Sequence, residues 1–221
     1  MLKYIDNNYL SKFNNEKVDS EISLQQPFKK YVDKTYYYDV SGNTADKSNT
    51  CISENYVIDN VTNADAVNAF AILCDILSDK LNEVASAEGL SELKTGLYCS
   101  RQPVFTIEAD NINANQKTLF EKVIDDTLND IVTKGIDKNT VKSLITSYES
   151  IKNKDMLSKD LGIQLNDNIM QSWLFGGDPT SYLDADRYIN ALKKELSGGY
   201  FEDMIKKYLT QLSHIKMMVE A

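Results

Sequence analysis

The stretch TNADAVNAFAILCDILSDKLNEVASAEG, Thr62 to Gly89, carries the clearest secondary-structure signal in the chain. Apolar side chains recur along it at alternating spacings of three and four residues, which is the period of one helix face: Val67, Phe70, Cys74, Leu77, Leu81 and Val84. Thr62 and Asp65 resemble a capping box, and Gly89 supplies a C-terminal stop. We predict one long helix that packs on a sheet, in preference to a coiled-coil partner helix.

Alternating segments on both sides of this helix predict the sheet. The segment 34–41, KTYYYDVS, places Tyr36, Tyr38 and Val40 on one face and Tyr37 and Asp39 on the other. The segment 51–60, CISENYVIDN, alternates again after the turn-rich loop 42–50, so we expect these two strands to form an antiparallel pair. The segments 92–100 and 103–110 predict two further strands, joined closely enough to form a hairpin.

The remainder of the chain has helical periodicity. Segment 115–135 predicts a helix that ends at Gly135, and Asp137 is expected to cap the next one. Further helices are expected over 155–175, 179–197 and 200–211. We therefore predict an α+β fold: an antiparallel sheet with helices packed on one face, followed by a C-terminal helical extension. The opening segment 1–17 has the pattern of an amphipathic helix from its first residues. This suggests that the chain is a fragment of a longer protein.

Composition excludes several classes of protein. The 221 residues are 42% hydrophobic and 26% charged, which is typical of a globular protein. The net charge of −9 and the scattering of lysines among acidic residues argue against nucleic-acid binding. No apolar run approaches a membrane span and no signal peptide is visible. Three cysteines without CxxC spacing favour reduced thiols in a protein core, so we expect a cytoplasmic location and no membrane partner.

The inventory of reactive residues argues against catalysis within this chain. His214 is the only histidine, so neither an HExxH nor an HxxEH zinc motif exists here. His214 lies in a tail with no supporting strand-turn-helix, where a surface side chain is expected in place of a catalytic base. No phosphate-binding glycine motif is present. Acidic pairs such as Asp125–Asp126 and Asp184–Asp186 are typical of solvated helix faces and helix starts. We predict no catalytic residue, no metal ligand and no cofactor in this chain.

Two aromatic features allow both a functional and a structural interpretation. Tyr36, Tyr37 and Tyr38 form a weak candidate substrate-binding strand, to which an extended peptide adds as a further strand. The alternative, which the high frequency of tyrosine in strands favours, is a purely structural strand with aromatics on both faces.

The second feature is QSWLFGGDP, residues 171–179, which contains the single tryptophan. Trp173 falls at helical spacing from Leu165 and Ile169, so we expect it to anchor the core near a helix end. Gly176 or Gly177 is expected to take a left-handed conformation there, with Asp178 capping the next helix and Pro179 opening it. Gly198 and Gly199 are expected to separate the last two helices in the same way.

Several stretches together resemble one protein family. They are LKYIDNNYLSKF, DSEISLQQPF, ILCDILSDKLNEVASAEGL, RQPVFTIEADNIN, LFEKVIDDTLNDIVTKGIDKNTVKSLITSYE and SWLFGGDPTSYLDADRYINALKKELSGGYFEDMIKKYL. This pattern is similar to the presequence-protease and falcilysin branch of the pitrilysin/insulinase zinc metallopeptidases. The resemblance covers nearly the whole chain and is most specific in SWLFGGDP and GGYFEDMIKKYL.

The resemblance implies a place within a larger enzyme. Such enzymes have four related α+β domains in two halves that close around a chamber, with the inverted zinc motif in the first domain. This chain resembles the second, non-zinc-binding domain, as a fragment. The implied division is an N-terminal helix and connector over 1–32, a metallopeptidase-like domain over 33–153, and a helical extension toward the hinge over 154–221. One departure is that ILSDKLNEV continues where the family breaks its helix with a small-residue loop, so no substrate contact is carried over from that loop.

The implied function is a non-catalytic structural or chamber-wall domain of a zinc-dependent metalloendopeptidase that degrades unfolded peptides. Zinc would belong to the parent enzyme, and the partners would be the remaining domains and the peptide substrate. The alternative is a stand-alone binding or scaffold subunit that pairs with a separate catalytic chain. On either hypothesis the isolated chain is expected to be inactive.

Overall fold

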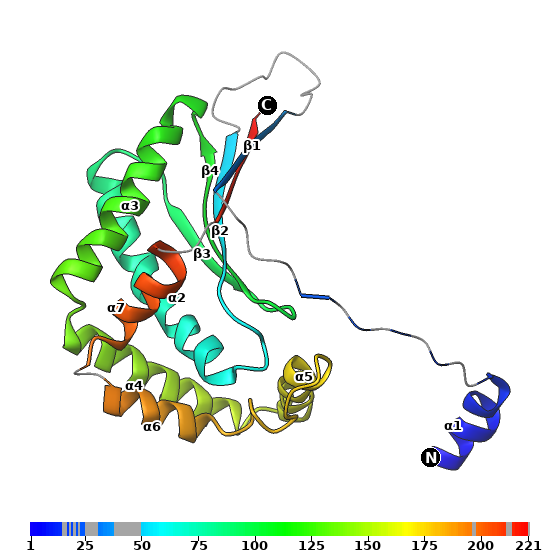
Figure 1. Ribbon diagram of the computed structural model, residues 1–221. Helices are drawn as coiled ribbons and strands as arrows, with labels where there is room; N and C mark the ends of the chain where they lie inside the picture. The colour runs from blue at the N-terminus through cyan, green and yellow to red at the C-terminus, as the bar shows by residue number, and fades with distance from the viewer. Residues whose placement is uncertain are drawn as a thin grey trace.

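The computed structural model describes residues 1–14, 17, 19, 21, 23–24, 31–37, 50–195, 198–210 and 214–220. Its strands are β1 (Val32–Tyr37), β2 (Thr50–Val57), β3 (Leu93–Tyr98), β4 (Val104–Ile112) and β5 (Ile215–Glu220). Its helices are α1 (Leu2–Asn8), α2 (Ala64–Ala87), α3 (Lys117–Lys134), α4 (Lys138–Asp155), α5 (Leu161–Trp173), α6 (Ala185–Glu195) and α7 (Tyr200–Ile205). One sheet with helices on one face gives the predicted α+β class (Figure 1).

The sheet has the strand order β1-β5-β2-β4-β3, and its pairing is mixed. The β3–β4 hairpin is confirmed, and β2 pairs antiparallel with both β4 and β5. However, β1 runs parallel to β5, so the sheet is not wholly antiparallel as predicted. The predicted pairing of the first two strands is also wrong, because β5 lies between them. Alternation along a strand fixes which side chains share a face, but it does not specify the neighbouring strand.

The C-terminal segment is the largest correction to the predicted fold. The expected helical extension does not continue to the end, because residues 215–220 form β5 inside the sheet. Met218 and Lys216 of β5 point toward the helix-covered face and are buried there. A buried lysine breaks the usual apolar alternation, and this is why the sequence pattern did not indicate a strand.

Helix α2 lies at the centre of the core, as its periodicity predicted. Of its apolar stripe, Val84 alone remains partly exposed. Its cap is Asn63 in place of Thr62, since the Asn63 side chain accepts a hydrogen bond from the backbone N–H of Ala66. Gly89 takes a left-handed φ of 77° just beyond the helix end. The helix is continuous through ILSDKLNEV. The structure thus has a helix where the family resemblance implies a small-residue loop.

Helix α3 ends and helix α4 begins at the residues that the sequence predicted. Four side chains of α3 pack inward: Phe120, Ile124, Leu128 and Ile131. Gly135 ends α3 with a φ of 80°. The Asp137 carboxylate accepts a hydrogen bond of 2.9 Å from the backbone N–H of Thr140 and so caps α4. None of the helices in the described ranges is long and apolar enough to cross a membrane; the cytoplasmic location stays a prediction.

The QSWLFGGDP joint differs from its prediction at two points. The Trp173 side chain is 60% exposed and is therefore no core anchor. Gly176 takes the expected left-handed φ of 80°, but Asp178 caps only a turn, in which Thr180 donates to its carboxylate. Helix α6 begins six residues later than expected and is capped by Asp184, which accepts from the backbone N–H of Arg187. Ser172 is the fully buried side chain of α5, whereas Leu165 and Ile169 are half-buried.

Candidate functional site

The face of the sheet opposite the core helices is the most extensive candidate surface. Figure 1 shows α2, α3 and α7 together on one side of the strands, and no helix in the described ranges lies against the other side. Side chains alternate along a strand, so every second residue of each strand points to this second side. We call it the open face and define it by Lys34, Tyr36, Met217, Val219, Cys51, Ser53, Asn55, Thr106, Glu108, Lys94 and Tyr98.

The open face combines apolar side chains with a small hydrogen-bonded network. Asn55 donates 3.0 Å to the Ser53 hydroxyl and accepts 2.9 Å from the Thr106 hydroxyl. These bonds fix three polar side chains across the central strands β2 and β4. Most of the surrounding side chains are partly exposed. Such a surface offers apolar contact and hydrogen-bonding groups.

The predicted tyrosines lie at one edge of this sheet. Tyr36 is 49% exposed and belongs to the open face, whereas Tyr37 is 76% exposed and points to the other side. Tyr38 lies outside the described residues. In the described chain β1 pairs with β5 alone, so it is an edge strand. The structure therefore brings two of the three tyrosines to an edge, which is the position that strand addition needs.

A buried charged cluster supports this edge from the helix-covered side. The Lys216 ammonium on β5 lies 3.3 Å from the Glu54 carboxylate on β2 and also contacts the Glu121 carboxylate on α3. Tyr56 donates a 2.6 Å hydrogen bond to Glu54. Burial raises the pKa of Tyr56 well above its ordinary value, and the Glu54 charge adds to this. Burial lowers the pKa of Lys216, but Glu121, Tyr31 and Glu54 outweigh it, and the net shift is upward.

His214 belongs to the same cluster, so the expectation of a surface side chain is wrong. Its ring packs 4.6 Å from the Tyr56 ring and 4.9 Å from the Tyr31 ring, centroid to centroid. Its Nε2 lies 3.5 Å from the Glu54 carboxylate. No local sequence pattern predicts this cluster, because Glu54 and Lys216 lie far apart in the sequence. The only available signal was Glu54 itself, a charged residue among the alternating apolar positions Ile52, Tyr56 and Ile58.

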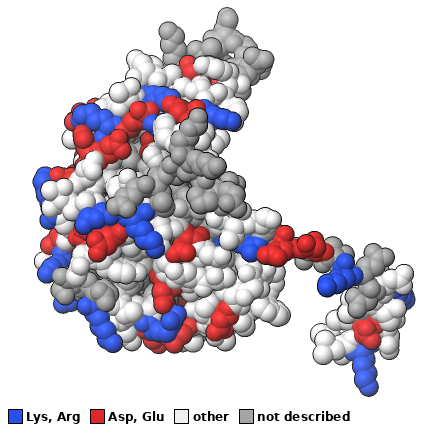
Figure 2. Space-filling view, viewed as in Figure 1, with Lys and Arg blue, Asp and Glu red and all other residues white. Residues whose placement is uncertain are grey.

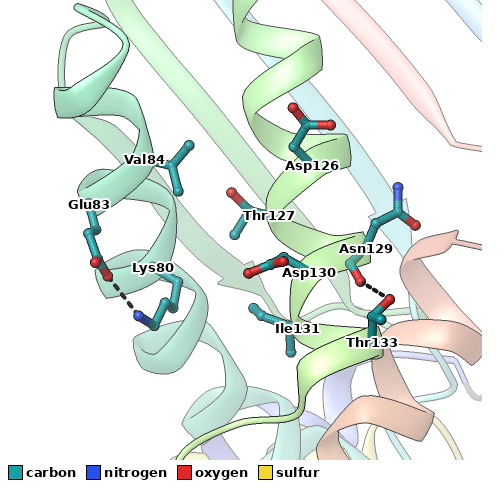
Figure 3. Close-up of a pocket in the computed structure, with 9 residues that line it drawn as sticks. All are labelled: Lys80, Glu83, Val84, Asp126, Thr127, Asn129, Asp130, Ile131 and Thr133. Carbon is teal, nitrogen blue, oxygen red and sulfur yellow. Dashed lines mark hydrogen bonds and ion pairs between the residues drawn. The ribbon is translucent and has the colours of Figure 1, made fainter.

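A second candidate is the groove between α2 and α3, with a volume of about 450 Å³ (Figure 3). Its lining includes the Lys80–Glu83 ion pair at 2.7 Å and the carboxylates of Asp126 and Asp130. The Thr127 hydroxyl is buried there without a hydrogen-bond partner. These are mainly solvated helix-face groups, as was expected for Asp125–Asp126, and they include no histidine or cysteine.

The three cysteines differ in environment, so the expectation that all lie in the core holds for Cys74 and is wrong for Cys51 and Cys99. Cys74 is buried, Cys51 is half-buried and Cys99 is exposed, and all three are free thiols. Burial raises the pKa of the Cys74 thiol to about 12. Burial raises the pKa of Cys51 to about 12 as well, with a contribution from Asp110. Such thiols are poor nucleophiles at neutral pH.

Neither a metal site nor a nucleic-acid surface emerges from the described part of the chain. There, no three His, Cys, Asp or Glu side chains are placed to hold a metal ion together. On the face seen in Figure 2, basic and acidic side chains are interspersed, with no basic stripe. The absence of catalytic and metal residues stays a prediction for the whole chain.

The chain has clear sequence relatives, although no family model matches it. It is 28% identical to protein HypA of Clostridium perfringens over 224 residues, which is 98% of this chain and 23% of HypA. It is 23% identical to the mitochondrial presequence protease of Xenopus laevis over 230 residues, or 99% of this chain and 22% of that protein. The chain thus spans less than a quarter of the length of these curated relatives.

Solved structures show the same fold. The ferredoxin protease FusC, solved in complex with Arabidopsis ferredoxin, matches 99% of this chain with a TM-score of 0.74 and 11% identity, over 23% of its own length. A protease from Helicobacter pylori matches the full chain with a TM-score of 0.70 and 13% identity, over 51% of its own length. The inactive peptidase domain of a Bordetella parapertussis protein matches 79% of this chain with a TM-score of 0.64 and 10% identity, over 91% of its own length.

Sequence and fold therefore agree. The chain is similar in sequence to HypA and to presequence proteases, and it shares its fold with parts of solved proteases.

Proposed function

We propose that this chain is a non-catalytic chamber-wall domain of a zinc-dependent peptide-degrading metalloendopeptidase. The observation that carries the proposal is the pattern of coverage: HypA and the Xenopus laevis presequence protease match 98% and 99% of the chain, but the matched region is only 23% and 22% of their own lengths. Fold similarity to protease domains supports it. The remaining domains of the polypeptide and its unfolded peptide substrate are the proposed partners.

The open face is the proposed inner surface of this wall. It presents partly exposed apolar groups and a fixed network through Asn55, which suit contact with an unfolded peptide of varied sequence. The edge strand β1 is the proposed peptide contact, with Tyr36 on the open face and Tyr37 on the opposite side of the strand. We retain the division into 1–32, 33–153 and 154–221 as a proposal, with the addition that the last segment returns to the sheet as β5.

The residues of this chain do not fit a catalytic zinc ion. A zinc site of this class needs three protein ligands that include histidines, and the chain has one histidine. That histidine lies between two aromatic rings, with one carboxylate near its Nε2. We therefore place zinc elsewhere in the parent enzyme and derive no catalytic step from this chain.

The alternative of a stand-alone scaffold subunit has one observation in its favour. The fold also occurs as an inactive peptidase domain in a Bordetella parapertussis protein, so it exists without catalytic activity. The genomic sequence upstream of Met1 separates the two hypotheses. A continuous reading frame that carries HxxEH supports the domain hypothesis, whereas a stop codon there supports the subunit.

The first test uses the purified chain alone. We expect no stoichiometric zinc by mass-spectrometric metal analysis and no cleavage of an unfolded test peptide. The complete protein serves as the positive control for both measurements. One tightly bound zinc per isolated chain, or peptide cleavage that chelators abolish, would overturn the proposal.

The second test addresses the peptide contact. The complete enzyme with Tyr36, Tyr37 and Tyr38 all changed to Ser is expected to show a raised KM for peptide with an unchanged melting temperature. The matched control is Tyr4→Ser, which removes an exposed tyrosine from α1, outside the sheet. An unchanged KM in the triple variant would remove β1 from the proposal while leaving the chamber-wall role intact.

A further inference from the structure

Helix α5 leaves several large apolar side chains at its surface. Its inner side lines a cavity of about 440 Å³ beside α4 and α6, through Leu161 and Leu165 together with three amide side chains, those of Gln164, Asn168 and Gln171. Its Ile163 and the following Leu174 are nevertheless both 65% exposed, and Trp173 is 60% exposed. A surface helix normally buries its large apolar side chains. In α5 one apolar set faces the domain and a second set faces outward.

Helical geometry places the exposed apolar groups on one side. At 100° per residue, the exposed Ile163 and Leu174 and the half-buried Met170 fall within a narrow stripe, and the exposed Trp173 lies beside it. We call these four side chains the α5 stripe. Met156 and Leu157, in the turn that precedes α5, are also exposed, at 54% and 88%. Contiguous apolar surface of this kind on a soluble protein marks an interaction site.

The joint that follows α5 holds the stripe in a fixed position. Ser172 is fully buried, and the backbone N–H of Gly177 donates 3.1 Å to its carbonyl. Tyr182 is buried beyond the joint and donates its hydroxyl to the Val61 carbonyl. The backbone that carries Trp173 and Leu174 is therefore already ordered. A partner can bind these side chains without the entropy cost of ordering the chain.

We propose that the α5 stripe is the docking surface for another α+β domain of the same polypeptide. This inference rests on the proposed function, because it requires the chain to be one domain of a longer protein. The fitting partner surface is an apolar groove with a basic side chain opposite Asp167, which is exposed and lies within the stripe.

The comparisons support this occupant. The match to the Helicobacter pylori protease includes 100% of this chain but only 51% of that protease. The rest of that protease is therefore about as long as the region that shares this fold. The first half of the periplasmic protease PqqL from Escherichia coli gives the same relation, at 99% and 48%. A second copy fits less well, because a two-fold contact through the stripe brings two Asp167 carboxylates toward each other.

Hydrogen–deuterium exchange of the isolated chain and of the complete protein tests the proposal. We expect the amides of residues 161–174 to exchange at least about tenfold more slowly in the complete protein, because docking suppresses local opening. The amides of the core helix α3 serve as the reference and are expected to exchange equally in both. Equal exchange of residues 161–174 in the two proteins would overturn the proposal.

The double variant Ile163→Asp/Leu174→Asp provides the matching perturbation. In the complete protein it is expected to abolish the protection of α5, while the melting temperature of the isolated chain stays unchanged because both side chains are exposed. Tyr37→Asp, which alters an equally exposed apolar side chain on β1, is the control and should leave α5 protection intact.

Two further outcomes separate this proposal from the proposed function. Concentration-dependent dimerisation of the isolated chain that the double variant abolishes would assign the stripe to a second copy and overturn the inference. Protection of α5 in a complete protein without peptidase activity would support the inference while contradicting the proposed function.

Discussion

Helices α2 and α5 both carry apolar side chains at helical spacing, yet they occupy opposite environments. In α2 the periodic stripe Val67, Phe70, Cys74, Leu77 and Leu81 is buried between the sheet and the other helices. In α5 the residues at equivalent spacing are Leu165, Ile169 and Trp173, and the last of these is exposed. Periodicity states that a helix has an apolar face, but the surrounding elements decide whether that face is covered within this chain.

The difference also shows how the two helices are held. Helix α2 is wrapped by the sheet and by α3, α4 and α6, so each buried side chain contributes to stability through close packing. Helix α5 borders a polar cavity and is fixed chiefly by the joint after it. We therefore expect substitutions in α2 to change the free energy of unfolding strongly and substitutions on the α5 stripe to change it weakly.

The largest expected effect is Phe70→Ala in α2. Phe70 is fully buried and packs against the rings of Phe105 and Tyr208. Its truncation should lower the free energy of unfolding by about 3–5 kcal/mol, since apolar contact is lost and a cavity remains. Urea unfolding of the isolated chain measures this. A loss below about 1 kcal/mol would contradict the central position of α2.

The next effect is a dependence on pH that arises from Cys74 of α2. Burial raises the pKa of its thiol from an ordinary value of 9.0 to about 12 in the folded chain. Between these values the unfolded chain releases a proton that the folded chain keeps, so folding stability falls as pH rises from about 9 to 12. The Cys74→Ala variant should show a shallower decline, by roughly 2–4 kcal/mol over this window. Parallel urea midpoints for the two proteins would contradict the prediction.

A smaller effect is expected at the joint after α5. A Cβ on Gly177 would overlap the Ser172 hydroxyl and lie 2.7 Å from the Thr62 methyl. Gly177→Ala should therefore destabilise the chain by about 1–3 kcal/mol. The control is Gly162→Ala within α5, where a Cβ meets nothing and the helix gains up to about 1 kcal/mol. Equal melting temperatures for the two variants would show that the joint is not closely packed.

The smallest expected effect is Trp173→Ala. Because its side chain is 60% exposed, we expect a change below about 1 kcal/mol in the isolated chain. Chemical denaturation followed by circular dichroism measures this, since the substitution removes the only tryptophan fluorophore. A loss of about 3–5 kcal/mol, similar to that for Phe70, would restore the role of Trp173 as a core anchor.

Local patterns predicted much of the fold and little of the candidate site. The α2 stripe, the β3–β4 hairpin, the left-handed Gly89 and Gly135 and the Asp137 cap were all predictable, because each depends on neighbours in sequence. The Glu54–Lys216–His214 cluster was not, because its members meet only when β5 enters the sheet beside β2. Alternation predicted that Tyr36 and Tyr37 lie on opposite faces, whereas the exposure of both at a sheet edge was not predicted.

The sequence by itself determined the α+β class, the periodicity of the helices, the lack of a zinc motif and the resemblance to presequence proteases. These properties reside in residue type and spacing, which short-range sterics and hydrophobicity translate directly into local structure. Only the tertiary structure decided that the C-terminal segment is a strand between β1 and β2, and that Ile163 and Trp173 of α5 remain exposed. Both outcomes depend on contacts between segments far apart in the chain, and no local propensity encodes such contacts.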